Sequence, residues 1–312
     1  MGGNALKNVT RKSKDEYQKI KTSIFKKFQV ENINIDFPIE LFEKESFGDL
    51  DVLYNENINM KEIIIMLFDP KEIVVNGDVL SFNYEDFQID MIKCKYLDFA
   101  KFYFSYGDFG GIMGRIMNHY GFKFGHEGFW LNLYLEKNDL VDETHSYGKI
   151  ILTTCPEDFC KFVGLDYNIF FSLTSTNTIF EYIKSCKYFN PSIFETLNYD
   201  HNKRAKKRPM YISFLNDINV TIERGGTHIN ENLQLVGIKY FNREDEYEQI
   251  FNNLKRKKEI SNKFNGKILL NLGINQKSIG TIIKRFREKY NDEWILDNTE
   301  NTIINELKSH FI

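Results

Sequence analysis

The sequence predicts an α+β protein in which a mixed β-sheet with flanking helices is followed by a mostly helical C-terminal region. Over roughly the first 150 residues, short apolar runs alternate with segments of helical periodicity. From Pro156 onward, helical patterns follow one another with short loops between them. We therefore expect two domains, residues 1–154 and residues 155–312, which suits a chain of this length.

Composition narrows the class of protein. Hydrophobic residues make up 42% of the 312 residues and aromatic residues 15%, which is enough to bury a core. The formal net charge of −3 excludes a uniformly basic protein, so any nucleic-acid surface must be a local patch. The four cysteines form no Cys-x-x-Cys pair, and no run of eighteen apolar residues or signal-peptide core is present. A soluble, cytoplasmic protein without a membrane partner is expected.

The first elements follow from periodicity and from proline. Residues 13–28 predict a helix, because their apolar side chains fall on one stripe. Residues 35–42 predict a strand that Pro38 confines to a sheet edge, and residues 46–54 predict the strand that pairs with it. Residues 60–68 predict an amphipathic helix that ends before an Asp-Pro pair.

Two further strands are expected to complete the sheet. Asn76-Gly77-Asp78 is a turn signal between the apolar runs 73–75 and 79–82, and it predicts a hairpin. Residues 85–93 predict the next strand, and its stretch 87–92 is a short apolar run with one central acid, Asp90. Further along the chain, residues 129–135 and 149–154 predict strands, and residues 157–163, 178–187 and 192–197 predict helices.

Acidic residues on two of these strands suggest a metal centre. Asp49 and Asp51 are two apart, so on a strand they point to one face beside the small Gly48. Asp90 lies inside an apolar strand, where an acid is costly unless it is paired or bound to a metal. Carboxylates are the ligands that hard divalent cations prefer, and three of them suit a two-metal phosphoryl-transfer centre.

This arrangement resembles the nucleotidyltransferase superfamily that includes DNA polymerase beta, poly(A) polymerases, CCA-adding enzymes and small antibiotic nucleotidyltransferases. Gly48-Asp49-Leu50-Asp51-Val52-Leu53 is similar to the Asp-x-Asp element of that family, and Gln88-Ile89-Asp90-Met91-Ile92 is similar to its third-acid strand. The resemblance covers roughly the first 135 residues. It implies a nucleotidyltransferase palm in which Asp49, Asp51 and Asp90 are catalytic and bind two Mg²⁺ or Mn²⁺ ions per site, with an NTP as substrate.

The chain departs from the family at the segment that holds the triphosphate. The Gly-Ser that the family carries before Asp-x-Asp is absent here. Lys44 and Ser46, with Gly48, are one substitute, since they offer a cation and a hydroxyl. Gly2 and Gly3 are another, since backbone amides of glycines can approach phosphate. The two glycines fit a flexible start of the chain equally well, so both alternatives stay open.

A glycine-rich stretch provides further candidates. Four glycines lie between Gly107 and Gly114, ahead of a predicted helix over residues 112–120. In the resembled family, a helix after the third-acid strand contacts the base and ribose. The residues proposed for nucleotide contact are Ser105, Tyr106, Gly110, Gly111 and Arg115. Tight helix packing under an aromatic core explains the glycines as well.

Three basic runs in the second half suggest a polyanionic acceptor such as RNA. The first contains Lys203, Arg204, Lys206, Lys207 and Arg208, and the others span residues 255–258 and 284–289. Residues 264–284 also resemble the C-terminal helical element of CCA-adding enzymes. A solvated surface explains each single run, and a plain helix-turn-helix packing unit explains residues 264–284 nearly as well.

The resulting expectation is metal-dependent transfer of NMP from an NTP to an acceptor hydroxyl, most simply an RNA 3′ end. Asp90 would help to deprotonate that hydroxyl. A catalytically inactive member of the fold that binds RNA or a protein is one alternative. Nucleotidylation of a protein or small molecule, or an unrelated two-metal nuclease, are others.

Overall fold

The chain consists of two compact units. The computed structural model describes residues 5–133, 136–137, 140–141, 148–197, 199–220 and 231–311. The first unit comprises Met1–Asn132 with Ile151–Arg243, and the second comprises Leu133–Ile150 with Glu244–Ile312. This division differs from the expected boundary after residue 154, because residues 151–243 belong to the same unit as the N-terminal segment. Within the described residues, no helix has the length and apolarity needed to cross a membrane.

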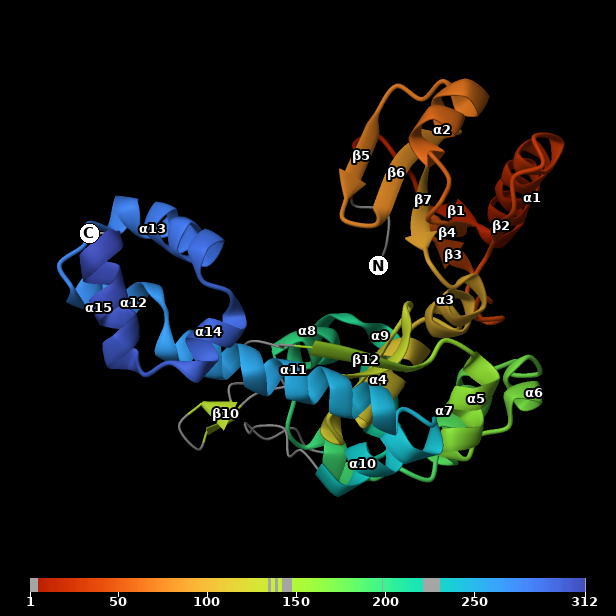
Figure 1. Cartoon of the computed structure of the whole chain (residues 1–312). Coiled ribbons are helices and arrows are strands. Elements are labelled where there is room, and N and C mark those ends of the chain that lie inside the picture. Colours follow the sequence, from red (N-terminus) through yellow and green to blue (C-terminus); the bar gives the residue numbers. More distant parts are fainter. Residues whose placement is uncertain are drawn as a thin grey trace. The chain divides into compact units, whose positions relative to one another are not determined.

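The first unit contains the expected mixed sheet, which confirms the α+β class (Figure 1). In the described part of the chain, five strands have the order β2-β4-β7-β6-β5. The parallel pair is β4 with β7, and the other neighbours are antiparallel. The strands are β2 (Ile35–Asp36), β4 (Asp49–Asn55), β5 (Ile73–Asn76), β6 (Val79–Tyr84) and β7 (Phe87–Cys94). The predicted hairpin joins β5 to β6, and Gly77 adopts the left-handed φ of 59° that the turn requires.

Each face of this sheet has a different chemistry. One face presents Leu50, Val52, Ile89 and Met91 to helices α1 (Lys14–Val30) and α2 (Met60–Phe68), and all four side chains are fully buried. The α2 bounds are those that the sequence predicts, and Ser13 caps α1 with a capping box. Because side chains alternate along a strand, the aspartates of β4 and β7 face the opposite side.

The predicted edge strand over residues 35–42 is wrong beyond its first two residues. Pro38 has no N–H to donate to a ladder, and the following residues bond to a different segment. The Ile39 amide donates to Ser105 Oγ at 2.8 Å, and the Ile39 carbonyl accepts from the Tyr106 amide at 2.7 Å. The chain therefore leaves the sheet after Asp36 and lines its acidic face instead. A short pair, β1 (Lys12–Ser13) with β3 (Ser46–Phe47), flanks this region.

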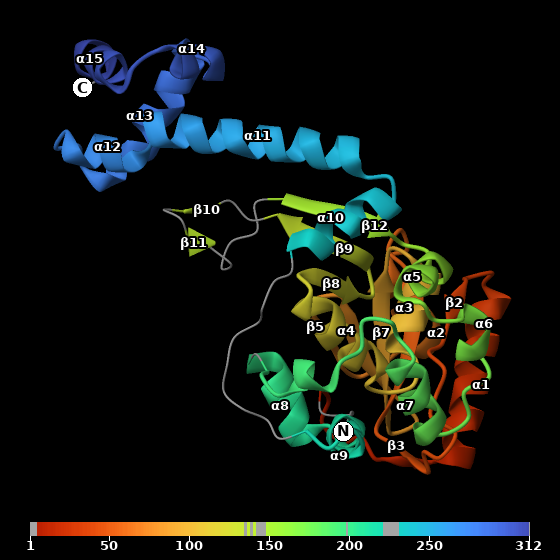
Figure 2. The same cartoon turned by 90° about the horizontal axis from the view of Figure 1, so that it is seen from below.

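The remainder of the first unit is built on a large aromatic core. Helix α3 (Leu97–Phe104) follows β7, and helix α4 (Phe109–His119) starts three residues before the predicted helix. A second sheet has the order β12-β9-β8, and Figure 2 shows these three strands side by side. Its strands are β8 (Phe122–Gly125), β9 (Gly128–Leu133) and β12 (Gly148–Thr153). The helices that follow are α5 (Pro156–Val163), α6 (Tyr167–Phe170), α7 (Thr176–Lys184), α8 (Tyr199–Lys207), α9 (Pro209–Asp217) and α10 (Glu231–Tyr240).

Ring contacts explain why helices α5 and α6 belong to this unit. Phe159 of α5 stacks on Phe124 with ring centroids 4.5 Å apart, and its edge meets Phe99 of α3. Phe170 lies 4.5 Å from Phe102. The predicted helix over residues 192–197 is a 3₁₀ turn, η1 (Pro191–Phe194).

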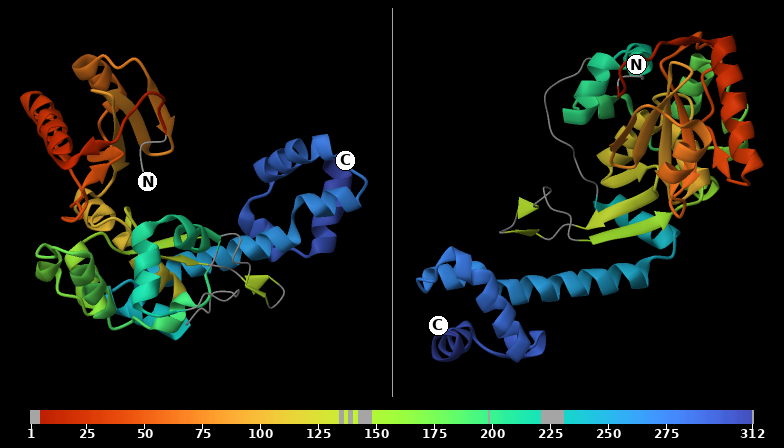
Figure 3. Two further views of the ribbon diagram at one scale, coloured as in Figure 1. Left: turned by 180° about the vertical axis from the view of Figure 1, so that it is seen from behind. Right: turned by 90° about the horizontal axis from the view of Figure 1, so that it is seen from above.

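The second unit is mostly helical. Its helices are α11 (Glu244–Lys263), α12 (Gly266–Asn271), α13 (Gln276–Lys289), α14 (Asp292–Asp297) and α15 (Glu300–His310), with a hairpin of β10 (Glu136–Lys137) and β11 (Leu140–Val141). The short helices gather near the C-terminal end of α11 (blue in Figure 3) around a core that includes Phe286, Ile295 and Leu307. The predicted turn between α12 and α13 is confirmed, and Gly273 there has a φ of 85°.

The close packing of α3 against α4 generates a first prediction. A Cβ added to Gly110 would lie 2.2 Å from the carbonyl oxygen of Tyr103, whereas one added to Gly114 of the same helix would meet its nearest neighbour at an ordinary 3.6 Å. Gly110→Ala should therefore lower the free energy of unfolding by about 2 kcal/mol or more. Gly114→Ala should leave it unchanged or raise it by up to about 1 kcal/mol. Urea denaturation of both variants checks this, and equal stabilities would contradict the packing role.

Candidate active site

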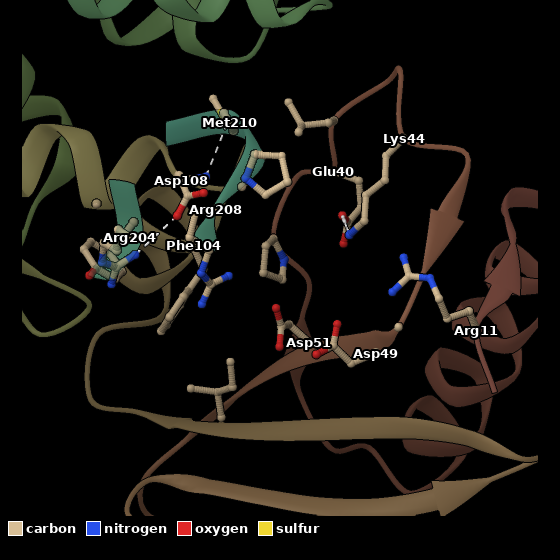
Figure 4. Close-up of a pocket in the computed structure, with 18 residues that line it drawn as sticks. Arg11, Glu40, Lys44, Asp49, Asp51, Phe104, Asp108, Arg204, Arg208 and Met210 are labelled. Carbon is tan, nitrogen blue, oxygen red and sulfur yellow. Dashed lines mark hydrogen bonds and ion pairs between the residues drawn. The ribbon is translucent and has the colours of Figure 1, made fainter. Parts of the chain in front are cut away.

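A cavity of about 460 Å³ opens on the acidic face of the first sheet (Figure 4). Side chains from widely separated parts of the sequence line it. The charged ones are Arg11, Glu40, Lys44, Asp49, Asp51, Asp108, Arg204 and Arg208. The apolar and small ones include Pro38, Leu41, Gly48, Ile92, Tyr103, Phe104, Gly107, Gly111, Pro209 and Met210. The cavity therefore contains three of the predicted nucleotide contacts, Lys44, Gly48 and Gly111, together with two of the three predicted catalytic acids.

Strand β4 places Asp49 and Asp51 at this cavity. The two carboxylates lie next to one another and point into it (Figure 4). Both residues are partly exposed, although the apolar residues that alternate with them are fully buried. In the parallel pair, Asp51 is opposite Asp90 and Asp49 is opposite Gln88, so all four side chains share one face of the sheet.

Asp90 is held by hydrogen bonds beside the cavity and is not among the residues that line it. Its side chain is only 9% exposed. Ser81 Oγ donates to Asp90 Oδ1 at 2.6 Å, and Gln88 Nε2 lies 2.9 Å from each carboxylate oxygen. Burial raises the pKa of Asp90, and the bonds from Ser81 and Gln88 oppose that rise.

Asp51 carries the strongest electrostatic perturbation of the acid group. Desolvation, followed by the charges of Asp49, Asp90 and Glu40, raises its pKa from 3.8 to about 8. Lys44 acts in the opposite direction, but its effect is smaller. A carboxyl whose pKa is raised by like charges in a cleft is a strong candidate for a functional group.

Glu40 is a further acid that lines the cavity, and no sequence pattern pointed to it. Tyr17 Oη donates to Glu40 Oε1 at 2.6 Å, and Lys44 Nζ lies 3.3 Å from Glu40 Oε2. The Tyr17 ring stacks on Phe47 with centroids 3.9 Å apart, which fixes the hydroxyl from the core side. Glu40 reaches the site only because the chain leaves the sheet at Pro38, and a departure of that kind has no local sequence pattern.

Basic side chains form other parts of the cavity lining. Arg11 donates through Nε to Ser46 Oγ at 2.9 Å and through its guanidinium to the Ser46 carbonyl at 2.7 Å. Ser46 itself is exposed in β3 and is placed beside Arg11. Arg204 forms an ion pair with the nearly buried Asp108 at 3.3 Å. No sequence pattern distinguishes Arg11, because it is a single arginine with no characteristic spacing to other polar residues.

Several predicted contacts lie elsewhere. Ser105 Oγ is fully buried and donates to the Lys101 carbonyl, and Tyr106 Oη donates to the Phe170 carbonyl at 2.8 Å. Arg115 is fully buried and donates to the carbonyls of Ile193 and Thr196. These three side chains, and Gly110, are absent from the cavity lining and serve packing. Gly2 and Gly3 lie outside the described residues.

The predicted acceptor run divides into two groups. Arg204 and Arg208 line the cavity, so they are placed to meet the same ligand as Asp49 and Asp51. Lys203, Lys206 and Lys207 are exposed on α8 and do not line it. Burial is the main cause that lowers the pKa of His201 to about 3, and the charges of Arg115 and Arg204 add to it.

The donor set fits a divalent cation in part. Asp49 and Asp51 supply hard oxygens from one face of a strand. The pKa of Asp51 is raised by burial and by neighbouring negative charges, and a bound cation would stabilise its ionised form. Among the described residues, however, no group of three or more His, Cys, Asp or Glu side chains is gathered closely enough to hold a metal ion. The third predicted ligand, Asp90, is engaged by Ser81 and Gln88 instead.

Comparison with known proteins adds no assignment, because no protein-family model and no curated protein matches the chain.

The raised pKa of Asp51 predicts how the stability of the metal-free protein depends on pH. Between about pH 4 and pH 8 the folded state holds a proton that the unfolded state has lost, so the free energy of unfolding should fall as pH rises through this range. Asp51→Asn should remove about 2 kcal/mol or more of that fall, since one pKa unit corresponds to about 1.4 kcal/mol. Urea denaturation in EDTA at pH 5 and pH 8 measures it.

The matched control is Asp78→Asn, which changes an exposed acid on the β5–β6 turn. It should leave the pH dependence as in the wild type. A stability that rises with pH in both the wild type and Asp51→Asn would contradict the electrostatic description of the site.

Proposed function

We propose that this protein is a metal-dependent nucleotidyltransferase that moves NMP from an NTP to an acceptor hydroxyl. The observation that carries the proposal is one cavity that combines Asp49 and Asp51 with four cations, Arg11, Lys44, Arg204 and Arg208. Adjacent carboxylates suit Mg²⁺ or Mn²⁺, and converging cations suit a triphosphate. The mixed sheet with a parallel β4–β7 pair, and Asp51 opposite Asp90, supports the nucleotidyltransferase palm that the sequence suggests.

The residues of the chain have distinct roles in this reaction. Asp49 and Asp51 would hold the two ions, and Asp90, which Ser81 and Gln88 hold beside the cavity, would complete the set of carboxylates. Bound ions supply Lewis-acid stabilisation of the charge that develops on the phosphoryl oxygens. Arg11, Lys44, Arg204 and Arg208 bind and orient the phosphates, which converts a bimolecular reaction into one between positioned groups.

The chemical step is an in-line displacement. The acceptor hydroxyl oxygen forms a bond to the α-phosphorus, and the bond from that phosphorus to the oxygen bridging the β-phosphate breaks. The hydroxyl proton passes to the Asp90 carboxylate, and pyrophosphate leaves with the bridging oxygen. Burial raises the pKa of Asp90 above that of an ordinary carboxyl, which favours its acceptance of a proton.

RNA is the acceptor that the charge distribution supports best. Lys203, Lys206 and Lys207 extend the basic surface of α8 beyond the two arginines of the cavity. The second unit also exposes cations, at residues 255–257 of α11 and at Lys284 and Arg285 of α13. Cations at successive positions neutralise a phosphate backbone without reading its sequence.

A labelling experiment tests the proposal. The full chain is incubated with each α-labelled NTP, Mg²⁺ or Mn²⁺ and total small RNA, and the products are resolved on a denaturing gel. Label should appear on RNA. Asp49→Ala, Asp51→Ala and Asp90→Ala should each lower incorporation at least about a hundredfold, since even residues that only support a metal ligand cost 10–100-fold.

Asp78→Asn again serves as the control and should retain full incorporation. Label on the protein or on a small molecule would change the acceptor and keep the reaction. RNA cleavage without a need for NTP would indicate a nuclease, and incorporation that survives all three alanine variants would overturn the assignment.

The divided basic run over residues 203–208 generates a separate prediction. Arg208→Ala should raise the KM for NTP about tenfold or more, because it removes a charged partner from the cavity. Lys206→Ala, on the exposed side, should leave the KM for NTP unchanged and reduce the salt dependence of RNA binding. Steady-state kinetics and RNA binding at two salt concentrations separate these effects, and identical behaviour of the two variants would contradict the division.

A further inference from the structure

Residues 5–13 form a segment that we call the N-terminal strap. It is fixed at several points to residues near the turn between β6 and β7. The Thr10 amide donates to the Asp86 carbonyl at 2.8 Å, and Asn83 Nδ2 donates to the Asn8 carbonyl at 3.3 Å. Leu6 is buried. At its far end the strap pairs with β3 and presents Arg11 to the cavity.

Gln88 connects this strap to Asp90. Its Oε1 accepts from the backbone amides of Ala5 at 3.0 Å and Leu6 at 3.3 Å. Its Nε2 donates to Asp90, and the side chain is only 2% exposed. The orientation of the amide follows from chemistry, because the reversed amide would set NH₂ against two N–H donors and an oxygen against a carboxylate.

These bonds also decide how Asp90 is presented. A carboxylate has about four acceptor positions, and the contacts from Ser81 and Gln88 use three of them. About one position is left for a cation or a proton, so the direction in which it points depends on Gln88. The side chain that orients Asp90 is thus the one that holds the start of the strap.

We propose that Gln88 is a positioning residue that couples the N-terminal strap, and with it Arg11, to the orientation of the Asp90 carboxylate. Binding of a triphosphate at Arg11 and use of Asp90 at the reaction centre are then linked through one amide. The roles of Arg11 and Asp90 rest on the proposed function, whereas the hold of Gln88 on the strap does not.

The first arm of the test needs no ligand. Hydrogen exchange of the strap is measured in the metal-free full chain for the wild type, Gln88→Met and Ser81→Ala. Methionine keeps the shape of glutamine and makes neither set of bonds, so strap exchange should quicken about tenfold. Ser81→Ala removes a bond to Asp90 without touching the strap, and its strap exchange should match the wild type. Wild-type exchange in Gln88→Met would overturn the proposal.

The second arm tests the coupling itself, which a merely structural residue would not show. The affinity for Mn²⁺ with tripolyphosphate is measured for Arg11→Ala, Gln88→Met and the double variant, and again with Arg208→Ala in place of Arg11→Ala. If the proposal holds, the strap end that Gln88 fixes helps to place Arg11, so the Arg11 and Gln88 losses should not multiply, whereas the Arg208 and Gln88 losses should. If the losses of affinity multiply in both double variants, the coupling between Gln88 and Arg11 is overturned. If the wild type does not bind Mn²⁺ with tripolyphosphate, the proposed function is contradicted. The hydrogen-exchange measurement would still show whether Gln88 holds the strap.

Discussion

The register of the parallel β4–β7 pair is the constraint on which the rest of the site depends. It sets Asp51 opposite Asp90, and it is fixed by the apolar residues on the other face of the same strands. A slip of one residue would turn Leu50 and Val52 toward solvent and bury the aspartates against α1 and α2. Four fully buried apolar side chains contribute about 6–12 kcal/mol on that face. This exceeds the roughly 4 kcal/mol at neutral pH that corresponds to the raised pKa of Asp51.

The cavity is assembled from segments that are distant in sequence, and each has a separate anchor in the fold. Tyr17 fixes Glu40 through a hydroxyl while its ring stacks in the core, and Ser46 fixes Arg11. Asp108 fixes Arg204 from a nearly buried position. Charged side chains held in this way lose little further entropy when a ligand binds, which is the usual basis of preorganisation. The cavity therefore holds acids and cations together. Lys44 pairs with Glu40 and Arg204 pairs with Asp108.

Local sequence patterns predicted most helices and strands and the two strands that carry Asp49, Asp51 and Asp90. Tertiary contacts determine the other residues of the cavity and the division into units. The bounds of α2, the β5–β6 hairpin and the placement of Asp49 and Asp51 on one face all followed from periodicity and turn residues. Glu40 and Arg11 could not be predicted, since each reaches the cavity through a long-range contact with no sequence period. The glycine-rich stretch suggested that Ser105 and Arg115 contact a ligand. Both side chains instead donate hydrogen bonds to backbone carbonyl groups. The boundary after residue 154 missed the aromatic contacts that join α5 to α3.

The measurement that tests the central claim most directly is anomalous diffraction from crystals soaked with Mn²⁺ and a non-hydrolysable NTP analogue. We expect manganese peaks about 2–2.5 Å from carboxylate oxygens of Asp49 and Asp51, with the triphosphate in contact with Arg11 and Arg208. Manganese bound elsewhere, or a triphosphate bound outside this cavity, would contradict it.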